Sequence, residues 1–376
     1  TPLASERARG AAIALVLAAF AAQALWRMHR GARRNRQLLD GLASGAGAAG
    51  AAGEAATPGA SEVALISRRF SEAVAVLRNR RVGARSAWSF LRRRPFVYEL
   101  PWYILIGAPG AGKTTTIVNS GLHFPLADAQ GGAKAVAGVG GTRHCDWWFT
   151  DEAVLIDTAG RYTTQDSYRE VDRAAWNGFL VQLAQHRPRQ PINVVILTLS
   201  VTDLLHPSAE RRRALAREMR ARIDELQQRL AIRFPIYLLV TKTDLLAGFT
   251  EFFADLDKDE RAQVWGVTFP LDGDADAAAR QSRLAGELTA LEKTLHEVLF
   301  ERLRDEPDRE RRAAAFGFPQ QWRVLREALA EMVQATFDAP ADANPALLRG
   351  VYFTSATQEG SPMDRALGGL ADVLVV

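Results

Sequence analysis

Five short runs of apolar residues recur between positions 102 and 353, and each ends at glycine or polar residues. They cover residues 102–106, 153–156, 193–201, 235–240 and 351–353. Continuous apolar runs of this length are typical of parallel strands that are covered on both faces. The pattern predicts an α/β fold in which a mostly parallel sheet carries helices on both faces.

Longer segments with apolar residues three and four positions apart predict helices. Residues 62–91 show this spacing, with arginines between the apolar positions. We favour a packing helix with a solvated basic face; the alternative is a helix near anionic lipid headgroups. Residues 249–253, 277–303 and 322–337 predict further helices, which form an insertion or subdomain that serves packing or partner contact.

These patterns divide the chain into several parts. A tract of small residues at 41–61 predicts a flexible linker, and an amphipathic helical region follows at 62–100. The sheet domain takes residues 101–248 and resumes at 349–376. The helical insertion lies between its two pieces, at 249–348.

An uncharged segment near the start of the chain, residues 10–26, predicts a transmembrane helix because 17 such residues are enough to cross a bilayer. Five arginines follow it and two precede it, so the positive-inside rule places the residues after about position 27 in the cytoplasm. Residues 1–40 are thus a membrane helix with an arginine-rich flank. A signal peptide and a buried helix are the alternatives.

The charge is distributed unevenly. The whole chain has a net charge of +4, but residues 1–94 contain 16 Arg, no Lys and five acidic residues. That segment therefore carries +11 and the remainder −7, which fits membrane orientation and lipid contact and gives no sign of nucleic-acid binding. One cysteine in 376 residues excludes a disulfide framework.

The loop after the first apolar run matches the pattern GxxxxGK followed by Ser or Thr, and reads GAPGAGKT. In such loops backbone N–H groups surround phosphate oxygens, Lys113 reaches the β- and γ-phosphates, and the Thr114 hydroxyl binds Mg²⁺. The predicted phosphate-binding residues are Gly107, Ala108, Pro109, Gly110, Ala111, Gly112, Lys113, Thr114 and Thr115.

A second motif, DTAG, follows the next apolar run. Asp157 at the end of that strand would hold Mg²⁺, and Gly160 would offer its N–H to the γ-phosphate. Thr142 precedes a further predicted strand at residues 145–150 and would complete the Mg²⁺ ligands. The predicted metal ligands are Thr114, Thr142 and Asp157.

Two later motifs concern the nucleotide base. Thr241 to Asp244 reads TKTD, close to a guanine-recognition signature in which the Asp accepts two hydrogen bonds from guanine and the Lys stem covers the base. Ser355 and Ala356 follow the last strand, where a backbone N–H would contact guanine O6. We therefore favour GTP over ATP, with Lys242, Asp244, Ser355 and Ala356 as base-binding residues.

The residue after Gly160 is Arg161, where fast GTPases often carry Gln. In one interpretation, Arg161 stabilises the negative charge that develops on the phosphate during hydrolysis. In the other, which we favour, Arg161 is a structural residue paired with a neighbour such as Glu170 or Asp166. Slow or partner-stimulated hydrolysis and binding without turnover stay open. The candidate catalytic residues are Lys113, Thr142, Asp157, Gly160 and Arg161.

Several long segments resemble the N-terminal cytoplasmic region of the TssM (IcmF) family, inner-membrane proteins of type VI secretion. They include GAPGAGKTT, GGTRHCDWWFTDEAVLIDTAGRYTTQD, RFPIYLLVTKTDLLAGFTEFF and GVYFTSATQEGSPMDR. The resemblance covers about residues 102–365, together with the membrane segment and its arginine-rich flank.

The resemblance implies an inner-membrane scaffold with a P-loop, GTPase-like domain and a bound GTP or ATP with Mg²⁺. It also implies self-association and contacts with TssL-like and TssJ-like subunits and with baseplate components. The alternative is a membrane-associated targeting GTPase similar to the signal recognition particle receptor class, which shares the GKTTT, DTAGR and TKxD motifs. The Gly-rich stretch that follows TKxD in that class is not found after Asp244.

Overall fold

The structure, a computed structural model, describes residues 60–83, 96–125, 145–164, 169–270, 277–338, 346–355 and 363. The predicted membrane segment, Thr142, Asp166 and Ala356 lie outside these ranges, as does all of the predicted linker except its last two residues. Among the described residues, none of the helices combines the length and apolar character that a membrane crossing requires.

Within the described residues, seven strands form one sheet in the order β2-β3-β1-β4-β5-β7-β6. Strands β3, β1, β4, β5 and β7 run parallel, and β2 and β6 pair antiparallel at the two edges. This confirms the α/β fold with a mostly parallel sheet. The strands are β1 (Trp102–Ile106), β2 (Cys145–Phe149), β3 (Val154–Thr158), β4 (Val194–Ser200), β5 (Pro235–Thr241), β6 (Gly266–Thr268) and β7 (Leu347–Phe353).

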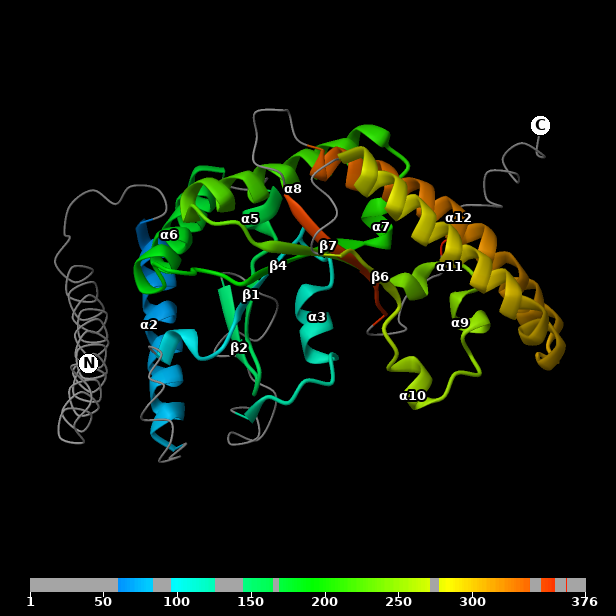
Figure 1. Ribbon diagram of the computed structural model, residues 1–376, viewed down its shortest axis with the longest axis horizontal. Coiled ribbons are helices and arrows are strands. Elements are labelled where there is room, and N and C mark those ends of the chain that lie inside the picture. Colours follow the sequence, from blue (N-terminus) through cyan, green and yellow to red (C-terminus); the bar gives the residue numbers. More distant parts are fainter. Residues whose placement is uncertain are drawn as a thin grey trace, which may run out of the picture.

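Helices lie on both sides of this sheet, as Figure 1 shows, with α3 on one side and α5, α6 and α8 on the other. Ile117 of α3 packs with Leu105 and Leu155 on the first side, while Ile104 and Ile156 join the larger core on the second. The helices are α2 (Ala60–Gly83), α3 (Lys113–Val118), α5 (Arg161–Thr164), α6 (Arg169–His186), α7 (Val201–Leu204), α8 (Ala209–Leu230), α9 (Phe249–Phe252), α10 (Lys258–Arg261), α11 (Ala277–Asp305) and α12 (Arg309–Phe337), with 3-10 turns η1 (Phe96–Tyr98) and η2 (Thr243–Leu245).

Helix α2 packs on the sheet domain, as the favoured interpretation of its pattern predicts. Phe70 is fully buried, and its ring lies 5.8 Å from that of Trp102 and 5.0 Å from that of Trp147. Arg69 of the same helix donates to Asp146 of β2 at 2.8 Å. Arg68 faces solvent. The arginine-rich helix is therefore attached to the domain by an apolar face and by ion pairs such as the one between Arg69 and Asp146.

The insertion between β5 and β7 is mainly helical, and it also includes a strand that the sequence did not predict. It contains β6, a three-residue strand that pairs with the outer edge of β7. So short a strand gives no periodic pattern, and only its partner defines it. The sheet also resumes at Leu347, two residues before the predicted boundary.

The predicted helix at residues 322–337 begins much earlier, at Arg309. Asp308 caps its start by accepting hydrogen bonds from the backbone N–H groups of Glu310 and Arg311 at 2.8 and 2.9 Å. Pro319 lies inside the helix and removes one backbone hydrogen bond. The helix continues across it because the neighbouring Phe318 and Trp322 are fully buried in the core.

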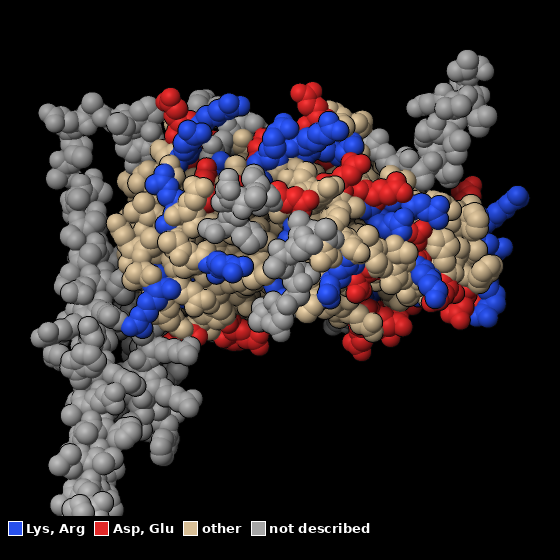
Figure 2. All heavy atoms as spheres, turned by 45° about the horizontal axis from the view of Figure 1, so that its top comes forward, with Lys and Arg blue, Asp and Glu red and all other residues tan. Residues whose placement is uncertain are grey.

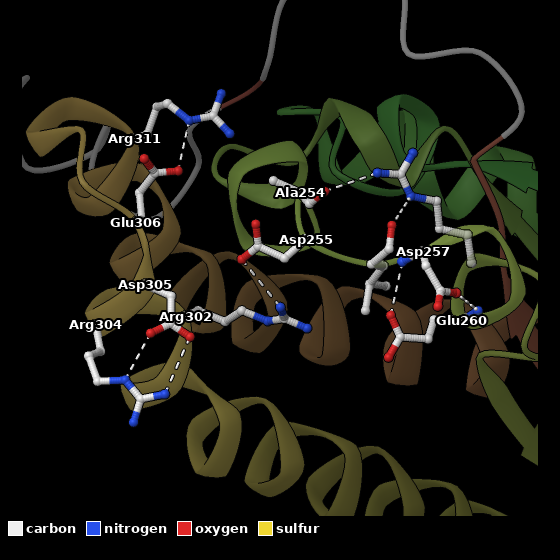
Figure 3. Close-up of polar contacts among 11 residues, drawn as sticks. Ala254, Asp255, Asp257, Glu260, Arg302, Arg304, Asp305, Glu306 and Arg311 are labelled. Carbon is white, nitrogen blue, oxygen red and sulfur yellow. Dashed lines mark hydrogen bonds and ion pairs between the residues drawn. The ribbon is translucent and has the colours of Figure 1, made fainter.

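Helices α11 and α12 form a hairpin that runs outward from the sheet edge (Figure 1). Trp322 anchors the hairpin, since its ring lies 4.8 Å from that of Phe353 in β7 and 4.9 Å from that of Trp265. Around the turn between the helices, charged side chains pair with one another. Figure 3 shows one such pair, Glu306 with Arg311, and the donor and acceptor atoms lie 2.8 Å apart. This hairpin is the insertion's main element.

Candidate functional site

The glycine loop, residues 107–114, joins β1 to α3. Gly110 and Gly112 have φ angles of +74° and +82°, which other residues rarely adopt. At Gly107 a Cβ atom would lie 2.3 Å from the backbone oxygen of Thr198 in β4. Two glycines are thus needed for backbone shape and the third for close contact with the sheet.

Lys113 folds back into the glycine loop. Its Nζ donates to the backbone oxygens of Gly107 at 2.8 Å and Ala108 at 3.1 Å. The side chain is buried, and the loss of hydration lowers the pKa of Lys113 to about 8, against an opposing effect from the nearby carboxylate of Asp157. The ammonium group thus occupies the centre of the loop.

Thr114 and Asp157, both predicted metal ligands, are brought together. The Thr114 hydroxyl donates to Oδ2 of Asp157. Asp157 lies at the carboxyl end of β3 and is fully buried. Hydroxyl and carboxylate oxygens at bonding distance are donors that suit Mg²⁺. The described part of the chain contains no group of three or more His, Cys, Asp or Glu residues that could hold a metal.

The Gly160 loop, residues 159–164, lies directly against the glycine loop. A Cβ atom at Gly160 would fall 2.4 Å from the backbone nitrogen of Pro109. The Thr163 hydroxyl donates to the backbone oxygen of Gly107 at 3.1 Å. The segment after β3 and the segment after β1 are therefore one packed unit.

Arg161 forms ion pairs with side chains of two other helices, α2 and α6. Its guanidinium group donates to Asp172 of α6 and to Glu62 of α2, each at 2.9 Å. Burial works against its charge, yet the hydrogen bond to Glu62 and the nearby acidic groups hold the pKa of Arg161 above its usual value. These ion pairs agree with the structural role favoured for Arg161. Of the two neighbours named from the sequence, Glu170 lies on the exposed face of α6, whereas Asp172 lies on its buried face, and Asp166 lies outside the described residues.

The candidate base-binding residues gather at the ends of β5 and β7. Lys242 adopts a left-handed conformation with φ of 60°. The buried carboxylate of Asp244 accepts a hydrogen bond from the Ser355 hydroxyl at 2.7 Å. Thr241, at the end of β5, donates to the backbone oxygen of Ala111 at 2.8 Å. That bond joins this cluster to the glycine loop.

Comparison with known proteins places the chain in a family. The family model of the IcmF-related N-terminal domain matches residues 169–375, more than half of the chain. The chain belongs to the IcmF-related family. It is 52% identical over 313 residues to a Pseudomonas aeruginosa protein described as type VI secretion system component TssM1. The match covers 83% of this chain and 28% of that protein, so the chain spans less than a third of its relative's length.

Two solved structures show partial likeness. The signal recognition particle receptor SRb-GTP/SRX complex from Chaetomium thermophilum has 21% identity and a TM-score of 0.26, covering 40% of this chain and 75% of that one. A GTP-binding protein from Sulfolobus solfataricus in complex with GDP has 15% identity and a TM-score of 0.23, covering 51% and 52%. At TM-scores this low, the two structures give no information about the function of this chain.

The candidate site of this chain contains contacts that the sequence motifs alone do not predict. Thr241 was open to prediction, because it is the first residue of the TKTD motif and its hydroxyl faces the glycine loop. Thr163 lies three residues beyond the DTAG motif, so the motif itself gives it no role. Glu62 is 99 residues from its partner Arg161, and only the docking of α2 brings the two together.

Proposed function

We propose that this chain is part of an inner-membrane component of the type VI secretion membrane complex. The identity of 52% with TssM1 is the observation that supports this role. The proposal places residues 10–26 in the bacterial inner membrane and the residues after about 27 in the cytoplasm. It includes self-association and contacts with TssL-like and TssJ-like subunits and baseplate components.

The second part of the proposal is that the sheet domain is a P-loop, GTPase-like module that binds a nucleoside triphosphate. The position of Lys113 carries this part. A buried ammonium group held by two backbone oxygens of a glycine-rich loop is ready to exchange them for phosphate oxygens, which are stronger acceptors. The backbone N–H groups of residues 107–115 then hold the phosphates.

Thr114 and Asp157 would hold Mg²⁺ in this module, with Thr142 as a further ligand. The bound ion would offset the negative charge of the phosphates. The close contact between Thr114 and Asp157 supports the assignment, since both oxygens already face one point. Gly160 lies against the glycine loop, and in this proposal its N–H would donate to the γ-phosphate.

Asp244 supports GTP over ATP. One of its carboxylate oxygens accepts from Ser355, which fixes the orientation of the side chain. A carboxylate oxygen has more than one acceptor site, so Asp244 retains capacity for the two N–H donors that guanine offers and adenine lacks. Lys242 would cover the base with its apolar stem, and the backbone N–H of Ala356 would bind guanine O6.

Hydrolysis by this module is proposed to be slow. The side chain of Arg161, which stands in the position of the water-orienting Gln of fast GTPases, is already engaged by two carboxylates. The module would then act as a nucleotide-dependent switch during assembly or secretion. The family match and the identity with TssM1 favour the secretion complex over the alternative of a protein-targeting GTPase.

The nucleotide proposal is tested by binding of fluorescent GTP and ATP analogues to the full chain in detergent. We expect the wild type to bind GTP, and Lys113→Ala to weaken binding by about tenfold or more, as for loss of a charged hydrogen bond. Lys293→Ala is the matched control, because Lys293 is exposed on α11. A wild type that binds neither analogue refutes nucleotide binding, and binding of ATP alone refutes the role of Asp244.

The secretion role is tested in the cell. Deletion of the gene should abolish contact-dependent secretion of type VI substrates, and expression of the intact gene should restore it. Complementation with Lys113→Ala then separates the scaffold from the nucleotide site. Unchanged secretion after deletion would refute the assignment to this complex.

A further inference from the structure

A side chain of helix α2 contacts a residue next to the candidate nucleotide site. Glu62 lies in the first turn of α2, and its carboxylate accepts a hydrogen bond from Arg161 at 2.9 Å. Arg161 directly follows Gly160, whose backbone lies against Pro109 of the glycine loop. The contact with α2 and the contact with the glycine loop are therefore made by consecutive residues.

Asp172 and Glu62, the acidic partners of Arg161 among the described residues, differ in how freely they can move. Asp172 is fully buried in α6, and removing a cation from a buried carboxylate is costly. Glu62 keeps a side-chain exposure of 20%, so its charge is partly hydrated. If the Gly160 loop moves, the contact that can adjust is the one with Glu62, and the contact with Asp172 stays.

The rest of α2 is fixed more firmly than Glu62. Phe70 is enclosed by the rings of Trp102 and Trp147, and Arg69 pairs with the buried carboxylate of Asp146. The first turn of α2 is also the end that follows residues 41–61, which the sequence predicts to be the linker to the membrane segment. Glu62 thus lies where the helix leaves that linker.

We propose that Glu62 is a positioning residue for the Gly160 loop and that the Glu62–Arg161 pair couples this loop to the start of α2. The inference rests on the proposed nucleotide site and adds its regulation. The pair holds the loop in the position in which Gly160 faces a third phosphate. A nucleoside triphosphate therefore benefits from the pair, and a diphosphate, which lacks that phosphate, does not.

The test compares Glu62→Gln with Glu72→Gln in the full chain. Glu72 is the matched control, because it lies on the same helix and its ion pair with Arg68 is solvent-exposed. The first measurement is hydrogen exchange of the Tyr162 and Thr163 amides, which bond to the backbone oxygens of residues 159 and 160. We expect Glu62→Gln to speed this exchange about fivefold, and Glu72→Gln to leave it unchanged.

The second measurement is the ratio of the dissociation constants for GTP and GDP. Glu62→Gln should weaken GTP binding about fivefold relative to GDP. A purely structural role would weaken both nucleotides equally and would overturn the inference, as would unchanged exchange in a chain that binds nucleotide. If the wild type binds no nucleotide, the proposed function and the coupling to the third phosphate both fail, while the exchange measurement still decides whether Glu62 positions the loop.

Discussion

Gly160 is needed for the space it leaves, and its backbone angles do not require a glycine. Its Cβ position would lie 2.4 Å from the backbone nitrogen of Pro109 and 2.8 Å from the carbonyl carbon of Ala108. Both obstacles are backbone atoms, which cannot rotate away as a side chain can. Any larger residue must therefore push the Gly160 loop and the glycine loop apart.

An alanine at position 160 should therefore destabilise the protein. Gly160→Ala should lower the free energy of unfolding by about 1–3 kcal/mol, the usual cost of overpacking. Gly286→Ala is the control, because Gly286 is exposed inside α11 and a Cβ there meets nothing within 4 Å. Gly286→Ala should raise the free energy of unfolding by about 0.5–1 kcal/mol. Urea denaturation measures the free energy of unfolding of both variants. Equal changes in the two variants would contradict the close contact at Gly160.

At the scale of elements, α2 is part of the domain's core. Its apolar face is buried against β1, β2 and α6, and Phe70 contacts residues from all three. By contrast, the ion pairs at the turn of the α11–α12 hairpin are exposed, as for Arg304 with Asp305 in Figure 3. Exposed pairs contribute little to stability, so apolar contacts such as those of Trp322 hold the hairpin.

Removal of one ring should show what α2 contributes. Phe70→Ala should lower the free energy of unfolding by about 3–5 kcal/mol, because it leaves a cavity between two tryptophans. Phe300→Ala is the control, since Phe300 on α11 is 79% exposed and its loss should change stability by less than about 0.5 kcal/mol. Tryptophan emission during urea denaturation reports both variants. A small effect of Phe70→Ala would mean that α2 is not integral to the fold.

At the scale of the whole molecule, the sheet is completed by a strand that is distant in sequence. Strand β7 pairs with β5 only after the insertion that contains the helical hairpin, and it brings Ser355 to Asp244. The basic excess of the chain belongs to residues 1–94. On the face of the described residues in Figure 2, acidic and basic side chains are intermixed. The net charge of the whole chain therefore describes neither residues 1–94 nor the remainder of the chain.

The sequence by itself determined the parts of this protein that depend on local spacing. Continuous apolar runs predicted the parallel strands, and the fixed intervals of the GxxxxGKT and DTAG motifs placed Lys113 and Thr114 in the loop after one strand and Asp157 at the end of another. Because the carboxyl ends of parallel strands meet at one edge of a sheet, these side chains had to come together once the strands paired. The contact between Thr114 and Asp157 confirms that expectation.

Only the tertiary structure decided the contacts between distant segments. Glu62 meets Arg161 because α2 docks on α6, and β6 is a strand because β7 offers it an edge. Helix α12 passes through Pro319 because burial of its neighbours outweighs one lost hydrogen bond. Local periodicity records which face of an element is apolar, but it does not record which other element will cover that face.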